Sequence, residues 1–210
     1  EIGGDRVIDV FSSALRNSNS TVRDNAVYGL GNCGDSRTVE LLIEFLKDPD
    51  ANVRMQTILS LRKRNRHNLG DPRTIEHLIA ALNDPAFKVR LQAVQCFTEF
   101  KETRAIDPLV SALLNADEPG IRYYAAIALG HIGDPRVVKQ LIVALQDKRD
   151  PDYTTNASTG AAEALGMIGD ARAVKPLISA LTHKNSEVQK NAINALRKIG
   201  TPEALAALER

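Results

Sequence analysis

One block of twelve residues recurs along the whole chain. Its clearest copy runs from Asp134 to Leu145, and similar copies occupy 71–82 and 170–181. The leucine that closes each copy returns every 31 to 36 residues. A period of this length is typical of stacked supersecondary units, none of which can bury its apolar face alone. The closing residues are Leu15, Leu46, Leu82, Leu113, Leu145 and Leu181.

Each copy of the block, and the segment that follows it, has the pattern of a helix. Apolar residues at Val138, Leu141 and Leu145 follow the 3.6-residue period, and Val22, Ala26 and Leu30 line one face of a following segment. Glycines end the second helices, where a left-handed residue is needed. Asp or Thr then caps the next helix, often with Pro at its first position. The predicted stop glycines are Gly34, Gly70, Gly133, Gly169 and Gly200, and the predicted caps are Asp35, Asp71, Asp134, Asp170 and Thr201.

This pattern predicts an all-α protein, an α-solenoid or superhelix of about six helix pairs. A content of 4 % aromatic residues with no Trp also argues against a β-sandwich or barrel. We expect a single domain over residues 1–210, because no domain boundary is evident in the sequence. The expected pairs span 5–36, 37–72, 73–103, 104–135, 136–171 and 172–201, and 202–210 forms the start of a further helix.

The charge balance argues against a nucleic-acid partner. The 27 Lys and Arg nearly cancel the 26 Asp and Glu, whereas proteins that follow phosphate backbones are usually far more basic.

No apolar run approaches the roughly 18 residues of a membrane span. No secretory signal is visible, so a cytoplasmic location is expected. The two Cys and four His show no metal-ligand spacing, and no metal is expected.

The repeat pattern resembles short HEAT-like repeats, and more narrowly those of the phycobilisome-lyase family. The pattern Asp-x-Arg-Ala-Val-x-x-Leu-Ile-x-x-Leu occurs at 170–181, and Ala-Ala-x-Ala-Leu-Gly-x-Ile-Gly-Asp occurs at 125–134. Ile121-Arg122-Tyr123-Tyr124-Ala125-Ala126, followed by a repeat with extra residues at 147–158, is similar to the E/F-type bilin lyases of cyanobacteria. The adjacent His and Cys of the isomerising branch have no counterpart here.

The resemblance implies a scaffold that handles phycobiliproteins, as a bilin lyase or lyase subunit or as an assembly or turnover factor. Its partners would be phycobiliprotein subunits or a lyase partner subunit. No cofactor is required, although a linear tetrapyrrole (bilin) would be a bound ligand. The resemblance assigns no catalytic residue. A generic protein-binding scaffold without a tetrapyrrole role is the alternative, and nucleic-acid binding is a lesser one.

A partner surface is predicted on the second helices. The positions two, three, six and ten after the leading Val of each second helix vary most between repeats, and they should point away from the core onto the inner face. End repeats carry polar residues there, whereas the middle repeats carry apolar and aromatic ones, as at a contact surface. The alternative is that these side chains are ordinary core. The predicted residues are Met55, Leu59, Leu91, Gln92, Gln95, Tyr123, Tyr124, Ile127, His131 and Met167.

Two insertions and one column of arginines carry further hypotheses. Arg62, Lys63, Arg64 and Arg66 lie in the first insertion and predict either an anion contact or a solvated loop. The second insertion, 147–158, forms either a ligand-contacting loop or a tolerated extension. First-turn arginines of the second helices are interpreted as a structural ladder, with a phosphate stripe as the alternative. They are Arg23, Arg54, Arg90 and Arg122, with Asp50, Asp84 and Glu118 as expected partners.

Overall fold

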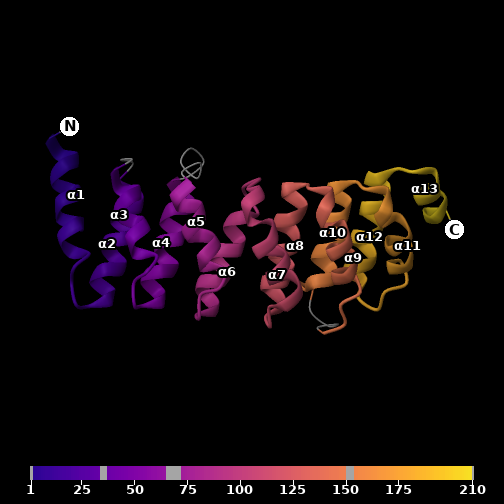
Figure 1. The fold of residues 1–210 in the computed structure, drawn as a ribbon, viewed down its shortest axis with the longest axis horizontal. Coiled ribbons are helices and arrows are strands. Elements are labelled where there is room, and N and C mark those ends of the chain that lie inside the picture. The colour runs from indigo at the N-terminus through magenta and orange to yellow at the C-terminus, as the bar shows by residue number, and fades with distance from the viewer. Residues whose placement is uncertain (1, 34–36, 65–71, 150–153, 210) are drawn as a thin grey trace. The chain divides into compact units, whose positions relative to one another are not determined.

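The computed structural model describes residues 2–33, 37–64, 72–149 and 154–209. The described residues are helical, without a strand, and the predicted all-α fold is confirmed. Consecutive helices within each part of the chain run in alternate directions (Figure 1). The chain divides into two compact units, Glu1–Cys96 and Phe97–Arg210. The expectation of one continuous domain stays a prediction, and each unit is described by itself.

The first unit holds three helix pairs. Each pair has a first helix and a second helix, in the order that the repeat pattern predicts. The elements are α1 (Ile2–Ala14), α2 (Ser20–Asn32), α3 (Arg37–Phe45), α4 (Ala51–Arg64), α5 (Pro72–Ala81) and α6 (Phe87–Phe97), the last ending one residue past the unit boundary.

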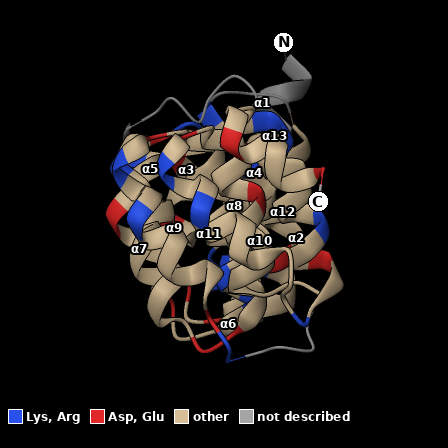
Figure 2. Cartoon of the chain, turned by 90° about the vertical axis from the view of Figure 1, so that its right-hand side faces the viewer, with Lys and Arg blue, Asp and Glu red and all other residues tan. Residues whose placement is uncertain are grey.

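The second unit repeats this organisation. The elements are η1 (Thr103–Ala105), α7 (Ile106–Asn115), α8 (Pro119–Ile132), η2 (Pro135–Val137), α9 (Val138–Leu145), α10 (Ala157–Ile168), η3 (Ala171–Ala173), α11 (Val174–Ala180), α12 (Ser186–Ile199) and α13 (Pro202–Leu208). A short 3₁₀ turn precedes each of α7, α9 and α11, and these three helices lie on one side with α8, α10 and α12 on the other (Figure 2).

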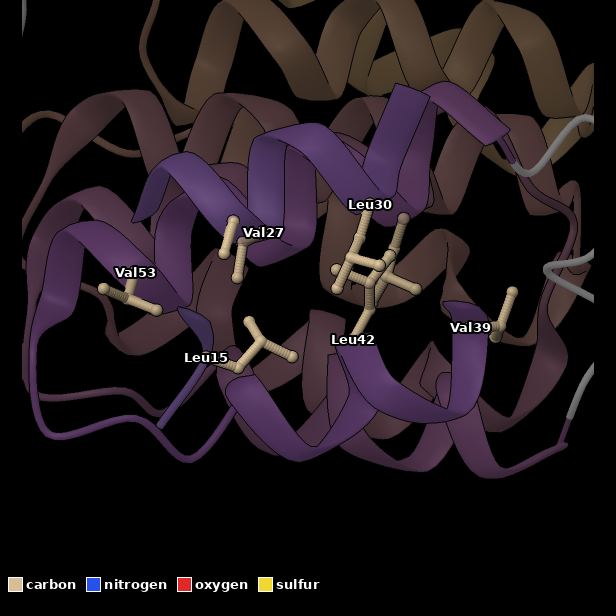
Figure 3. Packing of buried hydrophobic residues seen from close by; sticks show 8 residues of the cluster. Leu15, Val27, Leu30, Val39, Leu42 and Val53 are labelled. Carbon is tan, nitrogen blue, oxygen red and sulfur yellow. The ribbon is translucent and has the colours of Figure 1, made fainter. Parts of the chain in front are cut away.

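The core consists of the repeated apolar columns. In the first unit, Leu30 of α2 packs against Leu42 of α3, with Leu15 and Val27 beside them (Figure 3). All four residues are buried, and burying one such side chain contributes about 1.5–3 kcal/mol. The fully buried column of first helices is Leu42, Leu78, Leu109, Leu141 and Leu177, and that of second helices is Leu30, Leu61, Phe97, Leu129, Leu165 and Leu196.

The predicted stop glycines and helix caps are confirmed wherever the structure describes them. Gly133, Gly169 and Gly200 have φ of 76°, 75° and 66°, the left-handed conformation that glycine adopts without a Cβ clash. The side chains of Asp134, Asp170 and Thr201 accept the capping hydrogen bonds of the helices that follow. The other predicted stops and caps, Gly34, Gly70, Asp35 and Asp71, lie outside the described residues.

Candidate functional site

Arginines of the first unit fix the second helices to the turns around them. Arg23 donates to both carboxylate oxygens of Asp48, at 2.7 and 2.8 Å, and to two carbonyls of the turn before its own helix. Arg54 makes the same bonds to Asp84 and to the carbonyls of Asp48 and Pro49. Asp84 was an expected partner, but Arg23 bonds Asp48, not Asp50, because Asp50 instead caps the start of α4 through Asn52.

Arg122 has the corresponding position in the second unit. Its side chain is 1 % exposed, donates to the carbonyls of Ala116 and Asp117, and has Nε 3.6 Å from the carboxylate of Asp147. Asp147 also binds Arg149 at 2.7 Å. Asp147, the first residue of the second insertion, therefore supplies the carboxylate beside the ladder arginine Arg122 in this unit. Burial and the nearby Arg149 lower the pKa of Arg122. These contacts support the structural interpretation of the ladder over a phosphate stripe.

Carboxylates bonded to arginines have lowered pKa values. A hydrogen bond from the arginine two residues later lowers the pKa of Asp134, Asp170 and Glu102. Burial by itself would raise the pKa of Asp84 and Asp147, but hydrogen bonds from arginines and backbone amides outweigh it, and both values are lowered. These five groups therefore favour the folded state only while they are ionised.

Acid is expected to destabilise the protein over a defined range. A carboxylate whose folded pKa lies below its unfolded value of about 4 contributes fully above that value. Its contribution is lost as the pH falls through the lower folded pKa. We expect a constant urea midpoint between about pH 7 and 5 and a steady decrease below about pH 4, less steep in Asp84→Asn. A midpoint unchanged down to about pH 2.5 would contradict this assignment.

Glycines on the second helices let neighbouring second helices approach closely. A Cβ on Gly130 of α8 would lie 2.7 Å from the Cα of Ala164 of α10. A Cβ on Gly166 of α10 would lie 2.7 Å from the Cα of Ala195 of α12. Gly31 of α2 has the same relation to Ser60 of α4, whose hydroxyl would lie 2.6 Å away. The same repeat column thus sets helix spacing in both units.

The N-terminal end of α10 is buried between α8 and α12. Asn156 is 3 % exposed and caps the helix by accepting hydrogen bonds from the backbone N–H and hydroxyl of Thr159. The amide of Asn191 on α12 donates to the carbonyl of Thr159 at 3.2 Å. A Cβ on Gly160 would lie 2.8 Å from the carbonyl oxygen of Tyr123 on α8. Small residues here allow both α8 and α12 to contact α10.

Tyr123 and Tyr124 of α8 form an aromatic pair beside Glu163 of α10. Tyr123 and Tyr124 pack edge to face, with ring centroids 5.2 Å apart. The hydroxyl of Tyr123 donates to the carboxylate of Glu163 at 3.4 Å. Burial, and then the negative charges of Glu163 and Glu187, raise the pKa of Tyr123 to about 12. The hydroxyl therefore stays protonated at neutral pH and lies near two carboxylates.

A groove of about 530 Å³ runs beside these residues over α10 and α12. Glu163 of α10 and Glu187, in the first turn of α12, both line the groove, and Glu187 pairs with Lys190 at 3.2 Å. Basic side chains of the last turn of α12 line it as well. The lining residues are Glu163, Gly166, Glu187, Lys190, Asn191, Asn194, Ala195, Arg197 and Lys198. The groove is thus polar and carries both acidic and basic side chains.

The residues of the predicted partner surface lie on second helices, as expected, but they are divided between the two units. Met55, Leu59, Leu91, Gln92 and Gln95 are partly buried on α4 and α6 of the first unit. On α8 and α10 of the second unit, Tyr123, Tyr124 and Met167 are partly buried and His131 is exposed. Ile127 is 8 % exposed and lies within an entirely buried run, 125–130, so it belongs to the core of α8. The binding role of the set stays a prediction.

The predicted anion contact falls mostly outside the described side chains. Arg62 is partly buried near the end of α4, and Lys63 and Arg64 belong to the same helix. Arg66 lies outside the described residues. The anion contact therefore stays a prediction.

The described part of the chain contains no group of three or more His, Cys, Asp or Glu placed to hold a metal ion. Within the same part, none of the helices combines the length and apolar character needed to span a membrane.

Sequence reasoning missed the groove. Glu163, Lys190, Asn191, Asn194 and Lys198 occupy the same variable positions as the predicted surface, yet polar residues there do not indicate a contact surface by themselves. The signal that could have found them is the glycine column, because Gly166 brings α12 against α10.

Solved structures that resemble this chain to different degrees share little sequence with it. Escherichia coli YibA is 23 % identical with a TM-score of 0.69, and the match covers 93 % of this chain and 68 % of YibA. A designed armadillo repeat protein in complex with the peptide (KR)4 is 17 % identical with a TM-score of 0.59, covering 92 % and 99 %. The complex of CpcE and CpcF of phycocyanin lyase from Nostoc sp. PCC7120 is 19 % identical with a TM-score of 0.48, covering 96 % and 92 %.

No curated protein matches the chain in a sequence search. The family model for HEAT repeats matches residues 8–86, 75–160 and 158–210, which together span nearly the whole chain. These matches agree with the helix pairs of both units and with the repeat period. The chain belongs to the HEAT-repeat family.

Proposed function

We propose that this protein is a scaffold that binds a partner protein on the exposed face of its second helices. The observation that carries the proposal is the groove over α10 and α12, beside the Tyr123–Tyr124 pair of α8. Tyrosine is enriched at protein interfaces because it offers apolar area with a polar tip. A designed repeat protein of similar fold binds a peptide, which supports a binding role for this architecture.

The test uses one acidic substitution on the second helices of each unit, Leu59→Glu and Tyr124→Glu. Both residues are partly buried surface positions, whereas Ile127→Glu would disturb the core. Matched controls are Val10→Glu on α1 and Val143→Glu on α9, which are 64 % and 59 % exposed on first helices. The measurement is capture of partners from a lysate of the source cells, quantified by mass spectrometry, with helicity followed by circular dichroism.

We expect a partner retained by the native chain and both controls and reduced about tenfold or more by Tyr124→Glu, because a charge at a desolvated contact is costly. Equal capture by all five proteins would contradict the proposed surface. If only the controls Val10→Glu and Val143→Glu captured less of the partner, the partner contact would lie on the first helices instead.

A finer proposal is that the partner is a phycobiliprotein subunit or a lyase partner subunit, with a bilin held between the two proteins. Its support is the resemblance of 121–126 and the expanded repeat at 147–158 to E/F-type bilin lyases. Titration of purified phycocyanin subunits, with and without bilin, should give saturable binding and a change in bilin absorbance. Binding of other proteins instead would leave a generic scaffold.

A further inference from the structure

Glu163 lines the groove without a basic partner among the described residues. Its carboxylate accepts a hydrogen bond from Tyr123 that, at 3.4 Å, is long for two oxygens. It is partly buried, so water solvates it incompletely. Glu187, by contrast, has Lys190 beside it. Glu163 therefore has unused capacity to accept hydrogen bonds from a cation.

The surroundings of Glu163 favour a cation over other ligands. Lys190 pairs with Glu187 at 3.2 Å, whereas Glu163 has only the Tyr123 hydroxyl as a side-chain partner among the described residues, so the negative charge of Glu163 is not neutralised. The edge-to-face rings of Tyr123 and Tyr124 form the neighbouring aromatic surface on α8, and aromatic faces also attract Lys and Arg side chains. A Lys or Arg side chain meets both features, because its stem is apolar and its tip charged.

The last turn of α12 favours an acidic group. Arg197 and Lys198 lie in the last turn of α12. The close contact of Gly166 with Ala195 sets Glu163 level with the turn around Ala192, which is six residues before Lys198. At 1.5 Å per residue Glu163 and Lys198 are about 9 Å apart along the helix. An extended peptide covers this distance in about three residues.

We infer that the groove binds an extended segment of the partner, with a Lys or Arg against Glu163 and an acidic side chain about three positions away, near Lys198. The inference rests on the proposed binding function and names the chemistry of its partner. Asn191 and Asn194 also line the groove, and amide side chains can bond a peptide backbone. The occupant is thus a mixed-charge segment, not a uniformly basic one.

The test is selection of random 12-residue peptides displayed on phage against the native chain, Glu163→Gln, Lys198→Gln and Glu209→Gln. Glu209 is exposed at the end of α13, so its variant makes the same charge change away from the groove. The native chain and Glu209→Gln should enrich peptides with a basic and an acidic residue two to four positions apart. Glu163→Gln should lose the basic preference and Lys198→Gln the acidic one.

Fluorescence anisotropy on the consensus peptide gives the size of each effect. Loss of one charge-assisted contact should weaken binding about tenfold in Glu163→Gln, and Glu209→Gln should stay within about twofold. Enriched peptides that lack this charge pattern, or a pattern unaffected by Glu163→Gln, would overturn the inference but leave the binding function intact. Failure to enrich any peptide, together with equal lysate capture by all surface variants, would overturn both.

Discussion

Replacing Asp84 with alanine is expected to lower the free energy of unfolding by about 3 kcal/mol, the low end for breaking a buried ion pair. Asp84 accepts two hydrogen bonds from Arg54, at 2.7 and 2.8 Å, and a third from the backbone of Ala86. The two side chains are 12 % and 10 % exposed, so Arg54 would keep a largely desolvated charge without its carboxylate. Urea unfolding followed by circular dichroism at pH 7 measures the loss.

The matched control is Glu40→Ala. Glu40 pairs with Arg73 at 3.2 Å, but these side chains are 69 % and 62 % exposed. Exposed ion pairs contribute about 0–1 kcal/mol, so this variant should stay close to the native protein. Asp84→Asn should be intermediate, because it removes the charge and keeps an acceptor for Ala86. Similar losses for Asp84→Ala and Glu40→Ala would mean that the ladder does not stabilise the first unit.

The helix pairs could be predicted because the determining signals are local. A Leu or Phe that recurs at one position of each second helix, a glycine with positive φ and an Asp cap each act within a few residues of sequence. The structure confirms all three, as at Leu165, Gly169 and Asp170. Repetition adds strength, since these local signals recur in most of the pairs.

The side-chain partners and the groove could not be predicted in the same way, because they depend on how one pair packs on the next. Asp48 and Asp50 are equally acidic and two residues apart, and the fold decides that Asp48 meets Arg23. A surface predicted from repeat columns also requires that every second helix keeps an exposed face. Helix α8 has no exposed face at the level of Ile127. The six consecutive residues 125–130 are all buried, and six residues span more than one full turn of the helix.

Close packing between α10 and α12 leads to the second large effect, that of Gly166→Ala. The new Cβ would lie 2.7 Å from the Cα and 2.8 Å from the Cβ of Ala195, so backbone must move. Overpacking of this kind costs about 1–3 kcal/mol and exceeds the gain of up to about 1 kcal/mol in helix propensity. We expect a net loss of about 1 kcal/mol in urea unfolding, with weaker peptide binding because Gly166 also lines the groove.

Gly120→Ala isolates the propensity gain from this steric cost. Gly120 lies in the first turn of α8, and a Cβ there would meet nothing within 4 Å, so the variant should be neutral or stabilised by up to about 1 kcal/mol. Adding Ala195→Gly to Gly166→Ala removes the clash between the two methyl groups but leaves the new methyl group pressed against the backbone of α12, so it should restore stability in part. A stabilised Gly166→Ala would show that α10 and α12 can separate without cost, and the groove would then not be set by their close approach at this glycine.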